Sequence, residues 1–135
     1  MIPFIRKHFG KIYYPIVWSF IMAVLLCLPG AMLPSESKFS IPQFDKLVHM
    51  GMFGGFVFLW NLYLSTRVGS TTAGLLRSFF FIYILANAYG IGSEYLQGCC
   101  IPLRDFDLAD IIADMSGAGL AYGLSHLFLL PGGKK

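Results

Sequence analysis

Carboxylates, a lysine, a histidine and a glutamine occur inside segments of this chain that are otherwise almost wholly apolar. They recur at spacings of three and four residues, which place side chains on one face of a helix. These residues are Asp45, Lys46 and His49 in FDKLVHMGMF, Glu94 and Gln97 in YGIGSEYLQG, and Asp107, Asp110 and Asp114 in DLADIIAD. A carboxylate at the centre of a membrane helix costs about 2.5–3.5 kcal/mol on insertion scales. These side chains therefore need partners inside the protein, or a function that justifies their position.

Two kinds of chemistry suit these groups. The candidate catalytic residues are His49, Glu94 and Asp110, because imidazole and carboxyl groups act as general acids and bases. The candidate pocket that would bind a substrate comprises Asp45, Lys46, Gln97, Arg104, Asp107 and Asp114. One histidine with several carboxylates also offers mixed ligands for a divalent ion, but their spacing is not diagnostic, so we predict no metal ligand set and no cofactor. The alternative interpretation is structural, an ion-paired and hydrogen-bonded plug that joins three helices.

The elements that carry these residues are predicted to be membrane helices. Of the 135 residues, 56% are hydrophobic and 13% are charged, and the mean hydropathy is +0.67, whereas about 25% of residues are charged in soluble proteins. We predict an all-α, polytopic membrane protein with a single domain (residues 1–135), a bundle of four transmembrane helices at about 13–33, 47–65, 78–97 and 108–130. Each run is long enough, or nearly so, to cross a hydrocarbon core of about 30 Å. The first exceeds the apolar core of about 7–15 residues in a signal peptide, so we expect a retained helix.

The basic residues predict the orientation of this bundle. Seven of the ten lie before the first helix, between the second and third, or after the fourth: Arg6, Lys7, Lys11, Arg67, Arg77, Lys134 and Lys135. Because cytoplasmic loops carry an excess of Lys and Arg, both termini are predicted to be cytoplasmic, in a multi-pass protein of the bacterial cytoplasmic membrane. All seven acidic residues then fall in outer loops or outer halves of helices. The polar faces of three helices are therefore expected to meet near the outer lipid–water boundary.

Asp114 and Glu94 are the acidic residues that most need partners. Asp114 lies four residues, or about 6 Å of helix rise, deeper than Asp110, so we expect it to face the bundle interior. Its expected counter-charge is His49, Lys46 or Arg104. The positive start of a helix stabilises carboxylates by about 0.3–1 kcal/mol, but Glu94 lies at the end of its own helix. Glu94 is therefore predicted to need a cation, a proton or a metal.

Small residues predict where helices approach closely. Pairs spaced by four, typical of packed membrane helices, are Gly51 and Gly55, Ala86 and Gly90, Ala113 and Gly117, and Gly119 and Gly123. Asn87, in the middle of an apolar run, is predicted to donate a hydrogen bond to another helix. Adjacent cysteines pair only with strain, so Cys99 and Cys100 are expected to be free thiols.

Three of these segments, in this order, resemble the VanZ-like family. DKLVH matches its Asp-Lys-x-x-His helix start, EYLQ its Glu-x-x-Gln helix end, and PLRDFDLADIIAD its Arg-x-x-Asp-x-x-Asp-type start of the last helix. The resemblance covers about residues 45–123. The matching positions are Asp45, Lys46, His49, Glu94, Gln97, Arg104 and Asp110. Asp114 departs from the family, which often has asparagine there, so a fixed charge state of the site is not implied.

The resemblance implies a role in the cell envelope. The family is named for an accessory protein that raises resistance to teicoplanin, so we expect a part in glycopeptide resistance or envelope homeostasis. The expected partner is a membrane lipid, a lipid-linked envelope component or the lipoglycopeptide itself. The alternatives are an integral membrane enzyme acting on a lipid-linked envelope substrate, and the structural plug. Nucleic-acid binding is not predicted, because the basic residues are few and explained by topology, and the sequence predicts no particular oligomeric state.

The predicted topology can be tested by labelling single cysteines with a membrane-impermeant thiol reagent in intact cells. In a cysteine-free background, a cysteine replacing Ser37 should react, because loop 34–46 is predicted to lie outside. A cysteine replacing Arg67 should react only after the cells are opened. Labelling at position 67 but not at 37 in intact cells would contradict the orientation.

Overall fold

The computed structural model describes residues 2–32, 43–67 and 71–130, and these parts of the chain are helical with short connections and no strand. The helices are α1 (Ile2–Phe9), α2 (Tyr13–Leu26), the short 3₁₀ helix η1 (Gly30–Met32), α3 (Phe44–Ser65), α4 (Thr72–Cys100) and α5 (Leu108–Leu129). The prediction of an all-α protein is confirmed.

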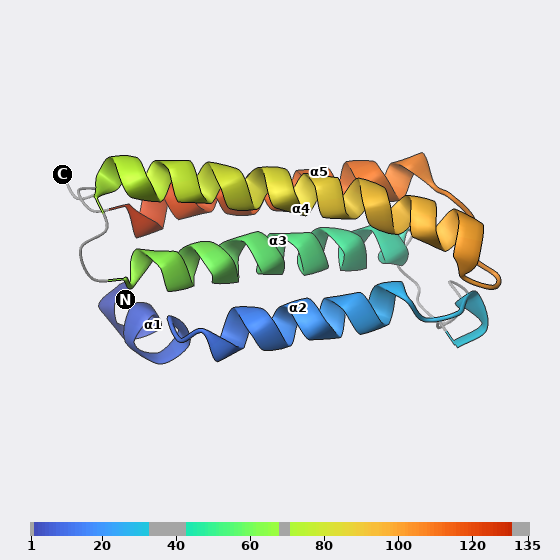
Figure 1. The fold of residues 1–135 in the computed structure, drawn as a ribbon, viewed down its shortest axis with the longest axis horizontal. Helices are drawn as coiled ribbons and strands as arrows, with labels where there is room; N and C mark the ends of the chain where they lie inside the picture. The colour runs from blue at the N-terminus through green and yellow to red at the C-terminus, as the bar shows by residue number, and fades with distance from the viewer. Residues whose placement is uncertain (1, 33–42, 68–70, 131–135) are drawn as a thin grey trace.

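The four long helices lie side by side along the length of the molecule (Figure 1). Their most extensive contact is between α3 and α5, while α4 packs on both of them and α2 packs on α3. Because α4 returns the chain to the end where α3 began, α3 and α5 run parallel, and α2 and α4 run antiparallel to them (Figure 1). This arrangement brings the start of α3, the end of α4 and the start of α5 to one end of the bundle.

The observed helix bounds correct some of the predicted ones. The predicted helix at 13–33 ends at Leu26, because Pro29 has no N–H to donate and disfavours helical geometry in the residue before it. Helix α1 precedes the first predicted segment, and α4 extends beyond the predicted 78–97 at both ends. By contrast, α5 matches its predicted range to within one residue, and α3 begins three residues before its predicted start.

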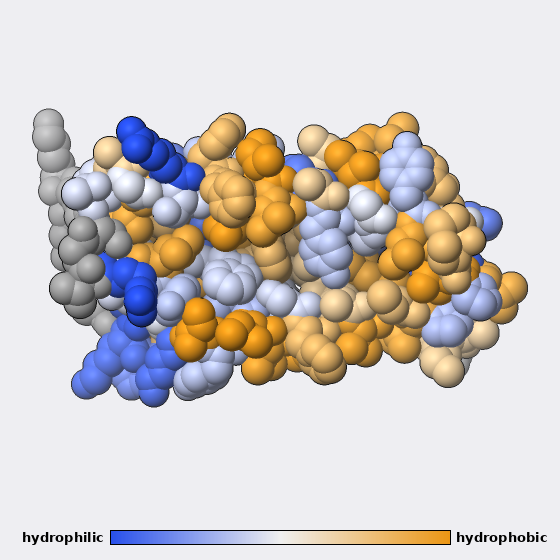
Figure 2. All heavy atoms as spheres, viewed as in Figure 1, coloured by the Kyte–Doolittle hydropathy of each residue, from blue (hydrophilic) through white to orange (hydrophobic). Residues whose placement is uncertain are grey.

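Two of the helices, α3 with 22 residues and α4 with 29, are long and apolar enough to cross a membrane. Helix α2 is apolar but has 14 residues, a length of about 21 Å at 1.5 Å per residue. Large hydrophobic side chains cover much of the exterior, among them Phe20, Phe81 and Leu127, which are 70%, 64% and 67% exposed. In Figure 2 hydrophobic residues dominate the middle of the visible face, and strongly hydrophilic ones gather at the end where α1 lies. Such a surface suits contact with lipid better than contact with water.

Glycines allow the backbones of α3 and α5 to touch. A Cβ added to Gly117 would lie 2.1 Å from the carbonyl oxygen of Met50, and one added to Gly54 would lie 3.2 Å from the carbonyl oxygen of Gly117. By contrast, a Cβ on Gly119 or Gly123 would meet nothing within 4 Å among the described atoms. The predicted close approach is therefore confirmed at Gly117 and wrong for the Gly119–Gly123 pair.

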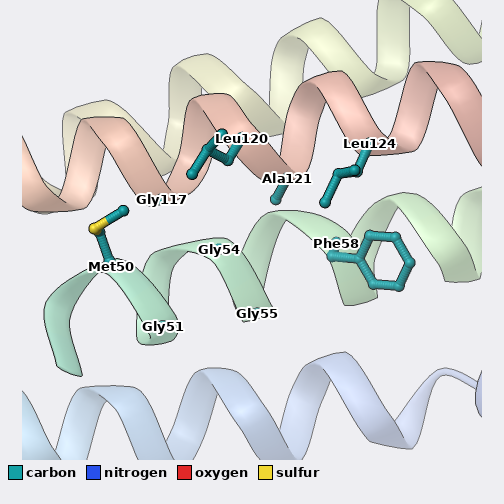
Figure 3. Close-up of a pocket in the computed structure, with 9 residues that line it drawn as sticks. All are labelled: Met50, Gly51, Gly54, Gly55, Phe58, Gly117, Leu120, Ala121 and Leu124. Carbon is teal, nitrogen blue, oxygen red and sulfur yellow. The ribbon is translucent and has the colours of Figure 1, made fainter. Parts of the chain in front are cut away.

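An apolar groove runs beside this contact, between α3 and α5 (Figure 3). Glycines and aliphatic or aromatic side chains form its walls: Met50, Gly51, Gly54, Gly55, Phe58, Gly117, Leu120, Ala121 and Leu124. The groove presents no ionisable side chain and is therefore not a place for acid–base chemistry.

Two predictions about polar residues are wrong. Asn87 Nδ2 donates to the carbonyl oxygen of Tyr83 in its own helix, at 2.7 Å, and not to another helix. An amide that does donate to another helix is that of Asn61, which donates to Ser125 Oγ across the α3–α5 contact at 3.0 Å. Cys99 and Cys100, exposed in the last turn of α4, are joined in a disulfide and are not free thiols.

The close approach of α3 and α5 predicts different effects for two glycine-to-alanine changes. Gly117→Ala should lower the free energy of unfolding by about 1–3 kcal/mol, because the new methyl group forces two backbones apart. Gly119→Ala is the matched control on the same helix, and it should be neutral or slightly stabilising because alanine favours a helix over glycine by about 0.5–1 kcal/mol. Thermal unfolding of the detergent-solubilised variants measures both. Equal stability of the two variants would show that the contact is not tight.

Candidate functional site

The ionisable residues predicted from the sequence gather at the end of the bundle where α3 and α5 begin and α4 ends (Figure 1). We call the following set the polar cluster: Asp45, Lys46 and His49 of α3, Glu94 of α4, Asp107 at the start of α5, and Asp110 and Asp114 of α5. Three of its members, His49, Glu94 and Asp114, are 1%, 0% and 1% exposed. They therefore depend on the protein for their partners.

The start of α5 organises the carboxylates around it. Asp107 is the N-cap, and its side chain accepts a hydrogen bond from the backbone N–H of Ala109 at 2.8 Å. The backbone N–H of Asp107 donates to Glu94 Oε2 of α4 at 3.1 Å. Glu94 therefore has a partner that its own helix does not provide, the positive end of α5. Its other oxygen, Oε1, is buried without a hydrogen-bond partner among the described residues.

Lys46 joins α3 to α5. Its ammonium group donates to the carboxylates of Asp107 and Asp110, and it lies 3.7 Å from Asp45 Oδ2. The ammonium group, with the Ala109 N–H, holds the pKa of the Asp107 carboxyl below its usual value. Asp107 therefore stays ionised at neutral pH, as an N-cap and ion-pair partner must.

His49 and Asp114 form a buried pair between the same two helices. His49 Nδ1 lies 2.9 Å from Asp114 Oδ1, and His49 Nε2 lies 3.9 Å from Asp110 Oδ2. The second oxygen of Asp114 is buried without a hydrogen-bond partner among the described residues. Gly90 of α4 makes room for it, because a Cβ there would lie 3.0 Å from Asp114 Oδ2. Asp114 thus faces the interior as predicted, and of its three expected partners it is His49 that it contacts.

Two predicted pocket residues contact a different part of the chain. Gln97 Nε2 donates to the carbonyl oxygen of Leu26 at 2.9 Å, and Arg104 Nε donates to that of Leu28 at 3.5 Å. The Leu26 carbonyl group lies at the end of α2, where helix geometry leaves it without an internal donor, and Leu28 follows α2 by two residues. Gln97 and Arg104 therefore attach α2 to the bundle, and Arg104 forms no ion pair with the described carboxylates.

Three members of the polar cluster could hold a metal ion. Asp45, His49 and Asp110 each offer a ligand atom, and these atoms lie within 4.8 Å of one another. The three residues come from two helices that are far apart in the sequence. The spacing of ligands along the chain therefore does not predict the set. Only the pairing of α3 with α5 brings it together.

The geometry suits proton transfer or cation binding. Five carboxyl groups surround two basic groups, Lys46 and His49, so the cluster attracts positive charge. Asp114 fixes the ring of His49, and a fixed imidazole beside carboxylates can move a proton.

Comparisons with protein-family models, with curated proteins and with solved structures find no match to the chain.

Cross-linking can test the arrangement of the cluster. In a cysteine-free background, cysteines replacing His49 and Asp110 should react with a short bifunctional reagent, because their side chains meet in the native protein. Cysteines replacing His49 and Ser125 are the control pair, since position 125 lies about 16 Å further along α5 than Asp114. Equal cross-linking of the two pairs, or none in the first, would contradict the described register of α3 and α5.

Proposed function

We propose that the chain is a VanZ-like integral membrane protein whose polar cluster binds the head group of a lipid-linked envelope component at the outer leaflet. Through this binding it contributes to teicoplanin-type glycopeptide resistance or to envelope homeostasis. The observation that carries the proposal is the meeting of the motif residues of α3, α4 and α5 at one end of an apolar bundle. The proposed topology has four membrane crossings with both termini in the cytoplasm.

The distribution of charge supports this topology. Arg6 of α1 donates to the carbonyl oxygen of Leu129 at the end of α5, and Thr66 at the end of α3 donates to that of Gly10. These two contacts place α1, the end of α3 and the end of α5 at one end of the bundle, with the basic residues near them. The polar cluster lies at the other end. A basic cytoplasmic end is what the positive-inside rule requires. Helix α5, with 22 residues, is about 33 Å long, a length close to the thickness of the hydrocarbon core, and in this proposal α5 and α2 cross as well.

The unpaired oxygens support a binding role over a purely structural one. A plug that served only to join helices would gain most if every buried polar atom were satisfied. Glu94 Oε1 and Asp114 Oδ2 are buried and lack hydrogen-bond partners among the described residues. Lys46 and its aspartates account for the joining of helices. Glu94 and Asp114 keep capacity for a ligand, an ion or a proton.

A second candidate function is catalysis on a lipid-linked envelope substrate. The contact of His49 Nδ1 with Asp114 favours it, because a carboxylate that orients an imidazole leaves the other ring nitrogen free for proton transfer. In this version His49 acts as the general base or acid, and Asp110 and Glu94 are the neighbouring carboxyl groups. Both candidate functions use the same end of the bundle.

Glu94→Gln separates function from folding. The amide oxygen of glutamine can still accept the hydrogen bond from the Asp107 N–H, so the variant should accumulate in the membrane and melt close to the wild type. It should nevertheless lose the protection against teicoplanin that the wild type confers on a sensitive host, because the charge of the carboxylate is gone.

Asp105→Asn is the matched control for Glu94→Gln, because Asp105 is an exposed carboxylate outside the polar cluster. It should retain wild-type protection. Membrane abundance and thermal stability are measured beside antibiotic susceptibility. Full protection by a well-folded Glu94→Gln variant would remove Glu94 from the mechanism, and loss of the protein itself would favour the structural plug.

A further inference from the structure

Among the described residues, one ring nitrogen of His49 has a hydrogen-bond partner, Asp114, and the other makes no hydrogen bond. In the tautomer that carries its proton on Nδ1, the ring donates to Asp114 Oδ1 at 2.9 Å. Nε2 then presents a lone pair, and the oxygen it faces, Asp110 Oδ2, is also an acceptor, 3.9 Å away. This distance is beyond a hydrogen bond. Two acceptors that face each other in a buried place are stabilised by a cation between them.

The surroundings of this gap provide a third ligand and the supporting contacts that metal sites have. Asp45 brings a carboxylate oxygen within 4.8 Å of the ligand atoms of His49 and Asp110, and ligands of one ion at about 2.0–2.2 Å lie roughly 3–4.4 Å apart, so small side-chain shifts suffice. Ligating histidines usually donate their other N–H to a carboxylate, and ligating carboxylates are themselves hydrogen-bonded. Asp114 fills the first role, and Lys46, bound to Asp110 Oδ1, fills the second.

We propose that Asp45, His49 and Asp110 bind a divalent transition-metal ion, with Asp114 as the residue that positions His49. A mixed set of one imidazole and two carboxylates suits Zn²⁺ or Mn²⁺. Three protein ligands leave coordination positions for water or for an anionic oxygen of a ligand. The ion would give an end of the bundle dominated by carboxylates a positive centre to which a phosphate could bind.

This site does not depend on the proposed function. The chain can bind the ion whether or not it protects cells from an antibiotic. The two ideas are therefore tested separately, the first by metal binding to the purified protein and the second by susceptibility.

The experiment measures Zn²⁺ binding to the full chain, purified in detergent, stripped with a chelator and dialysed. The wild type should bind one ion per chain. His49→Ala should weaken binding by at least about 100-fold, and Asp114→Asn by about 10–100-fold, the usual effect of losing a supporting contact. Asp45→Asn should weaken it by at least about tenfold, whereas Asp105→Asn, on an exposed carboxylate outside the site, should bind as the wild type does.

Replacing Zn²⁺ by Co²⁺ gives a visible spectrum that depends on the ligands of the ion. A change at Asp114 would leave this spectrum unaltered if Asp114 only stabilised the fold. The visible bands of Co²⁺ report its ligand geometry, so Asp114→Asn should shift them while its melting temperature stays near that of the wild type. Should His49→Ala fail to fold, Asp45→Asn decides, because the Asp45 side chain is 38% exposed and tolerates the change. Failure of the wild type to bind stoichiometric Zn²⁺, or equal binding by Asp45→Asn and Asp105→Asn, would overturn the metal site.

Discussion

A charge in an apolar bundle has to find its counter-charge within the protein, and the ammonium group of Lys46 shows how this constraint shapes the fold. It binds Asp107 and Asp110, so the first turns of α3 and α5 lie side by side. Below that level His49 meets Asp114, and further along the helices Asn61 meets Ser125. Glycine at position 117 allows the two backbones to come close enough for all three contacts. The parallel pair of α3 and α5 is thus held in register by polar contacts spread along its length.

The free N–H groups at the start of α5 extend this arrangement to a third helix. Glu94 of α4 accepts from the N–H of Asp107, so a carboxylate at the negative end of one helix is stabilised by the positive end of another. Gln97 and Arg104 then bind carbonyl groups at the end of α2 and just after it. The end of α4 and the connection to α5 therefore contribute residues to the candidate site and also attach α2 to the bundle. The site and the fold depend on the same segment for this reason.

The local sequence pattern predicts much of this structure, but it does not predict the contacts between residues that are distant in the sequence. Spacings of three and four correctly put Asp110 and Asp114 on an inward face of a helix, because a helix repeats at that period whatever surrounds it. The same pattern could not tell which base Asp114 would meet, since that depends on how α3 lies against α5. The predicted first helix is too long, because the apolar composition continues past the point where Pro29 and Gly30 end the helix. The resemblance to the VanZ-like family and the functions that it implies stay predictions.

The parallel pairing of α3 and α5 also determines when the protein can mature during its synthesis. His49 and Asp114 are 65 residues apart in the chain, and all of α4 is made between them. Until α5 is made, His49 lacks Asp114, and Lys46 has Asp45 of its own helix as an ion-pair partner but neither Asp107 nor Asp110. Assembly of this end of the bundle is consequently a late event. A chain truncated before α5 would lack the contact of His49 with Asp114 and those of Lys46 with Asp107 and Asp110.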